Sequence, residues 1–98
     1  MKSDTEIGSY LQNLRKERKM SLREVAEHIG IDVSMLSKIE HGERQLQSHM
    51  LLPISNLFNI DFKDFQIRYL NQKIEQEFGG QPCLKESLKK YLQKIEAS

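Results

Sequence analysis

The sequence predicts an all-α protein of six helices without a sheet. Three observations predict this fold class: apolar residues recur at three- and four-residue spacing, helix caps and glycine stops separate the periodic segments, and no segment alternates like a strand. The chain has 98 residues, of which 38% are hydrophobic and 30% charged. This length suits one compact domain with an appended element, because it lies just below the commonest domain size.

Two helices are expected in the first third of the chain. The first runs from about Asp4 to Lys19, and its apolar stripe consists of Ile7, Leu11 and Leu14. Ser21 and Glu24 form a capping box that opens the second helix, and Gly30 ends it. The inner face of this second helix is expected to be Leu22, Val25, Ala26 and Ile29.

A short third helix is expected from its N-cap at Asp32 to Glu40, with His41-Gly42 as its stop. A fourth apolar stripe follows at Met50, Leu51, Ile54, Leu57 and Phe58. Pro53 lacks the amide that a helix interior needs. The fourth helix therefore either starts late, near Met50, or kinks at Pro53.

Two longer helices complete the prediction. Asp61 with Asp64 resembles another N-terminal cap, and the fifth helix should continue to Gly79-Gly80 with a broad apolar surface. Pro82 is expected in the first turn of the sixth helix. The apolar repeat of that helix is Leu84, Leu88, Tyr91, Leu92 and Ile95.

The segment from Leu22 to Ile39 meets the requirements of two short helices that cross steeply over a tight turn, which is a helix-turn-helix. Ala26 is small where the second helix would cross close to the first. Gly30 permits a turn with positive φ, and Ile31 is expected to lie beneath it. Chance could produce such a pattern in a helical protein, but each feature stands at the required offset.

The third helix has an outer face without carboxylates. At about 100° per residue, Leu36 and Ile39 point inward and Glu40 lies at the rim of the buried face. Hydroxyls and a lysine can contact base edges, and a valine can contact a thymine methyl group, so this face suits the DNA major groove. The alternative is an ordinary solvated face, and the helix-turn-helix spacing before it favours DNA recognition. The predicted outer residues are Val33, Ser34, Ser37, Lys38 and His41.

The run IGSYLQNLRKERKMSLREVAEHIGIDVSMLSKIEHGERQ resembles the phage-repressor-like, or xenobiotic-response-element, helix-turn-helix family of bacterial and phage transcription regulators. The resemblance covers about half of the chain, from Ile7 to Ile60, and rests on LR, SLREVA, the turn glycine and LSKIEHG. It implies a five-helix DNA-binding domain that usually acts as a dimer on palindromic operators. The expected organisation is therefore a DNA-binding domain at 1–60 and a helical extension at 61–98.

The resemblance also implies roles for individual residues. Val33, Ser34 and Lys38 would contact bases, with Arg44 and Gln45 near phosphates. Arg15 would form a structural ion pair with Glu40.

This chain departs from the family pattern at two positions. Leu22 stands where a glutamine often contacts phosphate, and Arg23 beside it is expected to take that contact instead. Leu46 replaces the proline that often precedes the fourth helix, so the family pattern does not fix the loop geometry there.

Net charge does not supply DNA affinity. The whole chain has a formal net charge of +1, and residues 1–60 hold eight Lys plus Arg against eight Asp plus Glu. The affinity for DNA must instead come from helix amino termini and from a local basic cluster. This cluster consists of Arg15, Lys16, Arg18 and Lys19. Modest affinity per monomer follows, which favours dimers.

The two C-terminal helices need a surface to bury against, because an isolated helical hairpin is marginally stable. They either form a homodimer interface that sets the spacing of two recognition helices, or fold back over the first four helices. The residues expected at a dimer interface are Tyr69, Ile74, Phe78, Leu84, Leu88, Tyr91, Leu92 and Ile95.

Several classes of protein are disfavoured. Cys83 is the single cysteine, and the three histidines lack metal-ligand spacing, so no metal or cofactor is expected. Neither a glycine-rich phosphate loop nor a catalytic carboxylate pair is recognisable, so no catalysis is expected. Asp4 and Glu6 stand where a signal peptide needs apolar residues, and long apolar runs are lacking, so the expectation is a cytoplasmic protein without a membrane partner.

Two function classes remain. The first is a sequence-specific DNA-binding regulator, a repressor or controller type, that acts on double-stranded DNA as a homodimer. The second is an antitoxin or protein-interaction module whose C-terminal helices bind a partner protein. The acid-free outer face of the third helix favours the first class, whereas the long C-terminal extension favours the second.

Overall fold

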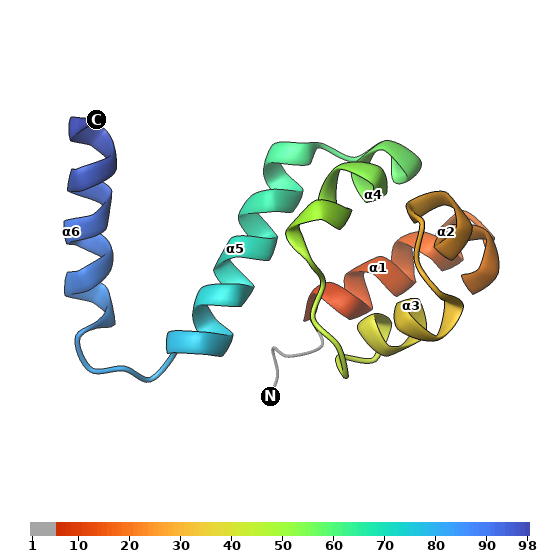
Figure 1. The fold of residues 1–98 in the computed structure, drawn as a ribbon, viewed down its shortest axis with the longest axis horizontal. Helices are drawn as coiled ribbons and strands as arrows, with labels where there is room; N and C mark the ends of the chain where they lie inside the picture. Colours follow the sequence, from red (N-terminus) through yellow and green to blue (C-terminus); the bar gives the residue numbers. More distant parts are fainter. Residues whose placement is uncertain (1–5) are drawn as a thin grey trace.

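A computed structural model describes residues 6–98 and confirms the all-helical fold (Figure 1). These residues form six α-helices and one 3-10 turn without a strand. The expected start of the first helix at Asp4 lies outside the described residues. The elements are α1 Glu6–Glu17, α2 Leu22–Ile29, α3 Val33–Glu40, η2 Ser48–Met50, α4 Leu51–Phe58, α5 Phe62–Phe78 and α6 Leu84–Ala97.

A single hydrophobic core joins α1 to α4 with the first half of α5, whereas α6 stands apart (Figure 1). The radius of gyration is 15.2 Å, compared with about 13 Å for a compact chain of this length. The projecting α6 accounts for the difference. The largest side chains buried in the core are Phe58, Phe65, Leu36, Ile39, Leu51 and Ile54.

The predicted caps of α2 are confirmed. The Glu24 amide donates to the Ser21 hydroxyl at 3.0 Å, and the Ser21 amide donates to the Glu24 carboxylate at 2.8 Å. Both orphan amides are therefore satisfied at the start of the helix. Gly30 ends α2 with φ of 74°, in the left-handed conformation that glycine adopts without a steric penalty. Asp32 is the N-cap residue of α3, but its side chain makes no capping hydrogen bond.

Pro53 is the third residue of α4, so the late start is correct and the kink is not needed. A proline is tolerated there because amides of the first helical turn have no intrahelical partner. The 3-10 turn Ser48–Met50 leads into the helix. Leu46, which the apolar pattern did not identify as core, is 3% exposed and closes the core beneath this loop.

The core continues past residue 60, because the inner face of α5 packs on α1. Asp61 caps α5 as predicted, since its carboxylate accepts from the Asp64 amide at 3.0 Å. Gln72 is buried, and its side-chain oxygen accepts the Ile7 amide at 2.8 Å. This contact satisfies an orphan amide in the first turn of α1, so α5 caps the helix on which it lies.

Two expectations for the C-terminal helices do not hold. Pro82 was expected in the first turn of α6, but the helix begins at Leu84 and Pro82 lies in the preceding turn. Tyr69 was expected at a dimer interface, but it is 8% exposed and belongs to the core of its own chain. Tyr69 points inward because it lies about one helical turn from buried Phe65, on the face of α5 that meets α1.

At Gly8, α1 approaches the backbone at the end of α3 closely. A Cβ atom there would lie 2.8 Å from the Glu40 carbonyl oxygen and would clash with the Ile39 carbonyl oxygen as well. Both obstacles are backbone atoms at the end of α3, so a side chain can be accommodated only if the two helices separate.

We expect Gly8→Ala to lower the free energy of unfolding by about 1–3 kcal/mol, because overpacking outweighs the better helix propensity of alanine. Urea unfolding followed by circular dichroism measures the change. Ser9→Ala is the matched control, because Ser9 is exposed on the same helix and should leave stability within about 0.5 kcal/mol. A Gly8→Ala protein as stable as the control would contradict the close packing.

Candidate nucleic-acid interface

The helix-turn-helix is formed by α2, the turn at Gly30 and α3. The Ile31 amide donates to the Ala26 carbonyl at 3.0 Å, so the turn closes directly on the end of α2. Ala26 is 1% exposed, as its small size predicts for a close helix crossing. Ile31 is half-buried against the core and holds the turn down.

The structure separates α3 into a buried face and an exposed face. Leu36 and Ile39 are each 1% exposed and anchor the helix in the core. Ser34 and Lys38 are exposed on the other side, and His41 is exposed where the helix ends. The outer face therefore carries a hydroxyl, a cation and an imidazole that are open to solvent.

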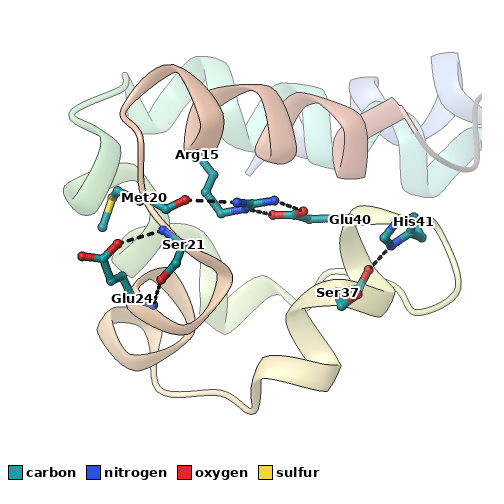
Figure 2. Close-up of polar contacts among 7 residues, drawn as sticks. All are labelled: Arg15, Met20, Ser21, Glu24, Ser37, Glu40 and His41. Carbon is teal, nitrogen blue, oxygen red and sulfur yellow. Dashed lines mark hydrogen bonds and ion pairs between the residues drawn. The ribbon is translucent and has the colours of Figure 1, made fainter.

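The predicted outer face is narrower than the helical angles suggested. Ser37 is half-buried, and Val33 is half-buried because it packs against the edge of the core. Only part of the Val33 side chain is therefore available for a thymine methyl group. His41 is fixed by its Nδ1 atom, which lies 2.7 Å from the Ser37 carbonyl oxygen (Figure 2). Since a carbonyl oxygen can only accept, Nδ1 carries the proton and Nε2 points away as the free ring nitrogen.

An ion pair between Arg15 and Glu40 braces the candidate interface from behind (Figure 2). Nε and Nη2 of Arg15 donate to the two Glu40 oxygens at 2.8 and 3.0 Å. The third donor, Nη1, reaches the Met20 carbonyl at 3.0 Å. One guanidinium thus joins the end of α1, the end of α3 and the segment that enters α2.

Because the pair is buried, removing one of its two partners would leave the other charge without a partner and destabilise the fold. The Glu40 side chain is 1% exposed and that of Arg15 is 12% exposed. The hydrogen bonds that Arg15 donates to Glu40 raise the pKa of Arg15 above its ordinary value, and burial opposes that shift. Pairing with Glu40 therefore favours the charged form that arginine already has at ordinary pH.

The remaining predicted contact residues lie on α2 and on the loop after α3. Arg23 is exposed on α2, one residue into the helix. Arg44 is exposed, and its amide donates to the Lys38 carbonyl at 3.3 Å, which holds the loop against the end of α3. Gln45 is also exposed, but its side-chain oxygen accepts from Lys73 of α5 at 2.6 Å.

The basic cluster at the C-terminal end of α1 is partly engaged in contacts within the protein. Nη2 of Arg18 donates to the Phe58 carbonyl at 2.6 Å, and the guanidinium lies 5.4 Å from the Phe58 ring centroid. Arg18 therefore links the end of α1 to the end of α4, although its side chain is partly exposed. Arg15 pairs with Glu40, and the two lysines of the cluster, Lys16 and Lys19, are exposed. The only signal of the Arg18 contact in the sequence is Phe58, an aromatic residue at the end of the fourth apolar stripe that an arginine can pack against.

Carboxylates flank the outer face without entering it. Asp32 precedes α3 and Glu43 follows it, and both are exposed. Among residues 6–98 no three His, Cys, Asp or Glu side chains gather as metal ligands. Within the same residues, no helix has both the length and the apolar character required to cross a bilayer.

We expect Arg15→Met to destabilise the fold by about 3–5 kcal/mol, because it leaves the Glu40 carboxylate buried without a partner. Urea unfolding at neutral pH measures the loss. The double variant Arg15→Met/Glu40→Met removes both charges at similar volume and should recover most of it. A single variant as stable as the wild type, or a double variant no better than the single one, would contradict this role of the ion pair.

Comparisons with known proteins agree with this geometry. A family model described as Helix-turn-helix matches residues 11–65, more than half of the chain. Over 59 residues, or 60% of this chain, the sequence is 39% identical to the HTH-type transcriptional regulator RamB of Mycobacterium tuberculosis, in two strains. The chain spans 12% of the length of these relatives.

Two solved structures of the clp gene regulator ClgR from Corynebacterium glutamicum share the fold. One has a TM-score of 0.59 at 22% identity and covers 72% of this chain and 92% of that chain. The other has a TM-score of 0.61 at 20% identity and covers 100% of this chain and 98% of that chain. Since the family model spans α2, the turn at Gly30 and α3, this chain belongs to the helix-turn-helix family.

Proposed function

We propose that this protein is a sequence-specific DNA-binding transcription regulator, of repressor or controller type, that reads an operator with α3. The observation that carries the proposal is the two-sided character of α3. Its inner residues are fixed in the core, whereas Ser34, Lys38 and His41 face solvent without a carboxylate among them. The similarity to the transcriptional regulator RamB supports the same reading.

The chemistry of the exposed side chains fits the major groove. The Lys38 ammonium can donate to the O6 and N7 acceptors of guanine, and the Ser34 hydroxyl can donate or accept at several bases. Nε2 of His41 can form a hydrogen bond with a base edge, because Nδ1 already contacts the Ser37 carbonyl. Arg23 and Arg44 would contact phosphates on either side and fix the register without reading sequence.

We propose that two copies act together on one operator. The net charge of +1 makes the general attraction to DNA weak, so a single two-turn recognition helix supplies limited affinity. A second copy on a related half-site adds a second set of contacts, and half-sites of such dimers lie about 34 Å apart. The double-stranded partner would then be a sequence with approximate twofold symmetry.

The C-terminal helices leave many large apolar side chains exposed, which favours a second candidate function. In this alternative the protein is an antitoxin or interaction module, and α5 and α6 bind a different protein. The helix-turn-helix would then be a scaffold or a second binding site. The first candidate predicts that substitutions on α3 abolish function through loss of DNA binding. The second predicts that substitutions on α6 abolish function through loss of the partner protein.

We expect Lys38→Glu to weaken operator binding by at least about 100-fold, because it loses a base contact of about 1–3 kcal/mol and brings a carboxylate to the bases. Fluorescence anisotropy at fixed salt, with DNA selected from a random pool, measures the loss. Lys90→Glu is the matched control: it makes the same charge change on the exposed polar side of α6.

Unchanged binding by Lys38→Glu, with both variants folded as the wild type, would contradict the proposed reading helix. Equal losses in the two variants would mean that only total charge matters, which would also contradict sequence-specific contact through α3.

A further inference from the structure

The large apolar side chains that remain exposed are concentrated at the C-terminal end of the molecule. Nine such side chains are exposed in residues 6–98, and seven of them follow residue 66. They lie on the outer side of α5 and on α6, and they are Ile67, Leu70, Phe78, Leu88, Tyr91, Leu92 and Ile95. Each is about half exposed, and Phe78, Leu88 and Tyr91 line one groove.

The α5 helix has two opposite apolar stripes. Phe65 and Tyr69 face the core, and at about 100° per residue Ile67 and Leu70 lie on the opposite side of the helix. These two stripes together account for the single broad apolar surface that the sequence predicts for the fifth helix. The structure uses one half of that surface and leaves the other half, from Ile67 to Phe78, uncovered.

The α6 helix has no buried residue at all. Its apolar residues, from Leu84 to Ile95, occupy an arc of about 100°. A 14-residue helix without tertiary contacts is marginally stable in water. Among residues 6–98 no apolar surface covers this helix.

An apolar groove lies between α5 and α6, which run in opposite directions (Figure 1). Ile74 and Phe78 line one side, Leu88 and Tyr91 line the other, and Pro82 closes the end.

We propose that a second copy of this chain covers this groove, with the α6 of each copy against the outer face of α5 of the other. The two pairs of helices then form a symmetric four-helix bundle. This inference rests on the proposed homodimer, and it assigns to that dimer a surface that includes Ile67 and Leu70 and excludes Tyr69.

The dimensions of the two stripes favour a second copy over another occupant. The α5 stripe from Ile67 to Phe78 and the α6 stripe from Leu84 to Ile95 each span eleven residue steps, or about 16 Å of helix. Two stripes of equal length can pair along their whole length under a twofold axis. A twofold axis repeats the contact, so each copy buries both of its stripes.

The apolar area agrees with this occupant. Seven side chains at about half of roughly 150–200 Å² give about 600 Å² of apolar surface per copy, close to the roughly 800 Å² per partner of a standard interface. Charged residues of both signs flank the α6 stripe, among them Lys85 and Glu96, and both are exposed. The apolar stripes, and not the charges at their edges, therefore carry the contact.

The test is sedimentation equilibrium of the full chain without DNA, from micromolar to submillimolar concentration. The wild type should pass from 11.5 kDa to twice that mass, and its helical circular dichroism should rise over the same range because α6 is stabilised on contact. Leu70→Glu and Leu88→Glu should each weaken dimerisation by at least about 30-fold. Lys90→Glu, on the polar side of α6, should dimerise as the wild type does.

Several results would overturn the inference. A wild type that stays at 11.5 kDa throughout would leave the surface to a different protein. Dimers that persist in both Leu70→Glu and Leu88→Glu would place the interface elsewhere. Loss of cooperative unfolding in these variants would show that the surface is covered within one chain.

The measurement separates this inference from the proposed function. Lys38→Glu should dimerise as the wild type does but lose operator binding. The proposed dimer surface can therefore be confirmed even if operator binding is not observed.

Discussion

The position of α3 depends on the buried contact between Arg15 and Glu40. Glu40 is the last residue of α3, where the partial negative charge of the helix end disfavours a carboxylate, and its side chain is withdrawn from water. Both costs are offset by one guanidinium, which also reaches the chain entering α2. Because its planar fork satisfies both carboxylate oxygens, it fixes the orientation of α3 as well as its position.

This constraint explains how a helix of eight residues can present a defined surface. Two turns of helix are unstable alone, so the core must hold α3 in place. Gly8 lets α1 approach its C-terminal end, and Ala26 lets α2 cross near its other end. Ser34 and Lys38 are exposed and lie outside the hydrophobic core, so their identity is not set by core packing.

Periodicity and capping chemistry were sufficient to predict most of the fold. The capping box at Ser21, the left-handed Gly30 and the core positions of the first four helices follow from local rules. Contacts between distant segments were less predictable: Gln72 capping Ile7 joins residues 65 apart, and no local pattern marks it. For α5, periodicity identified apolar residues but could not assign each stripe to the core or to the exterior, which is why Tyr69 was misplaced.

The most direct test of DNA contact through α3 is a nuclear magnetic resonance titration. The full chain is labelled with ¹⁵N and titrated with its selected operator. If α3 enters the major groove, the largest amide shift changes should fall on Ser34, Lys38 and the loop through Arg44, with α6 unaffected by added DNA at dimer-saturating concentration. Shift changes confined to α5 and α6, with the amides of α3 unmoved, would contradict it.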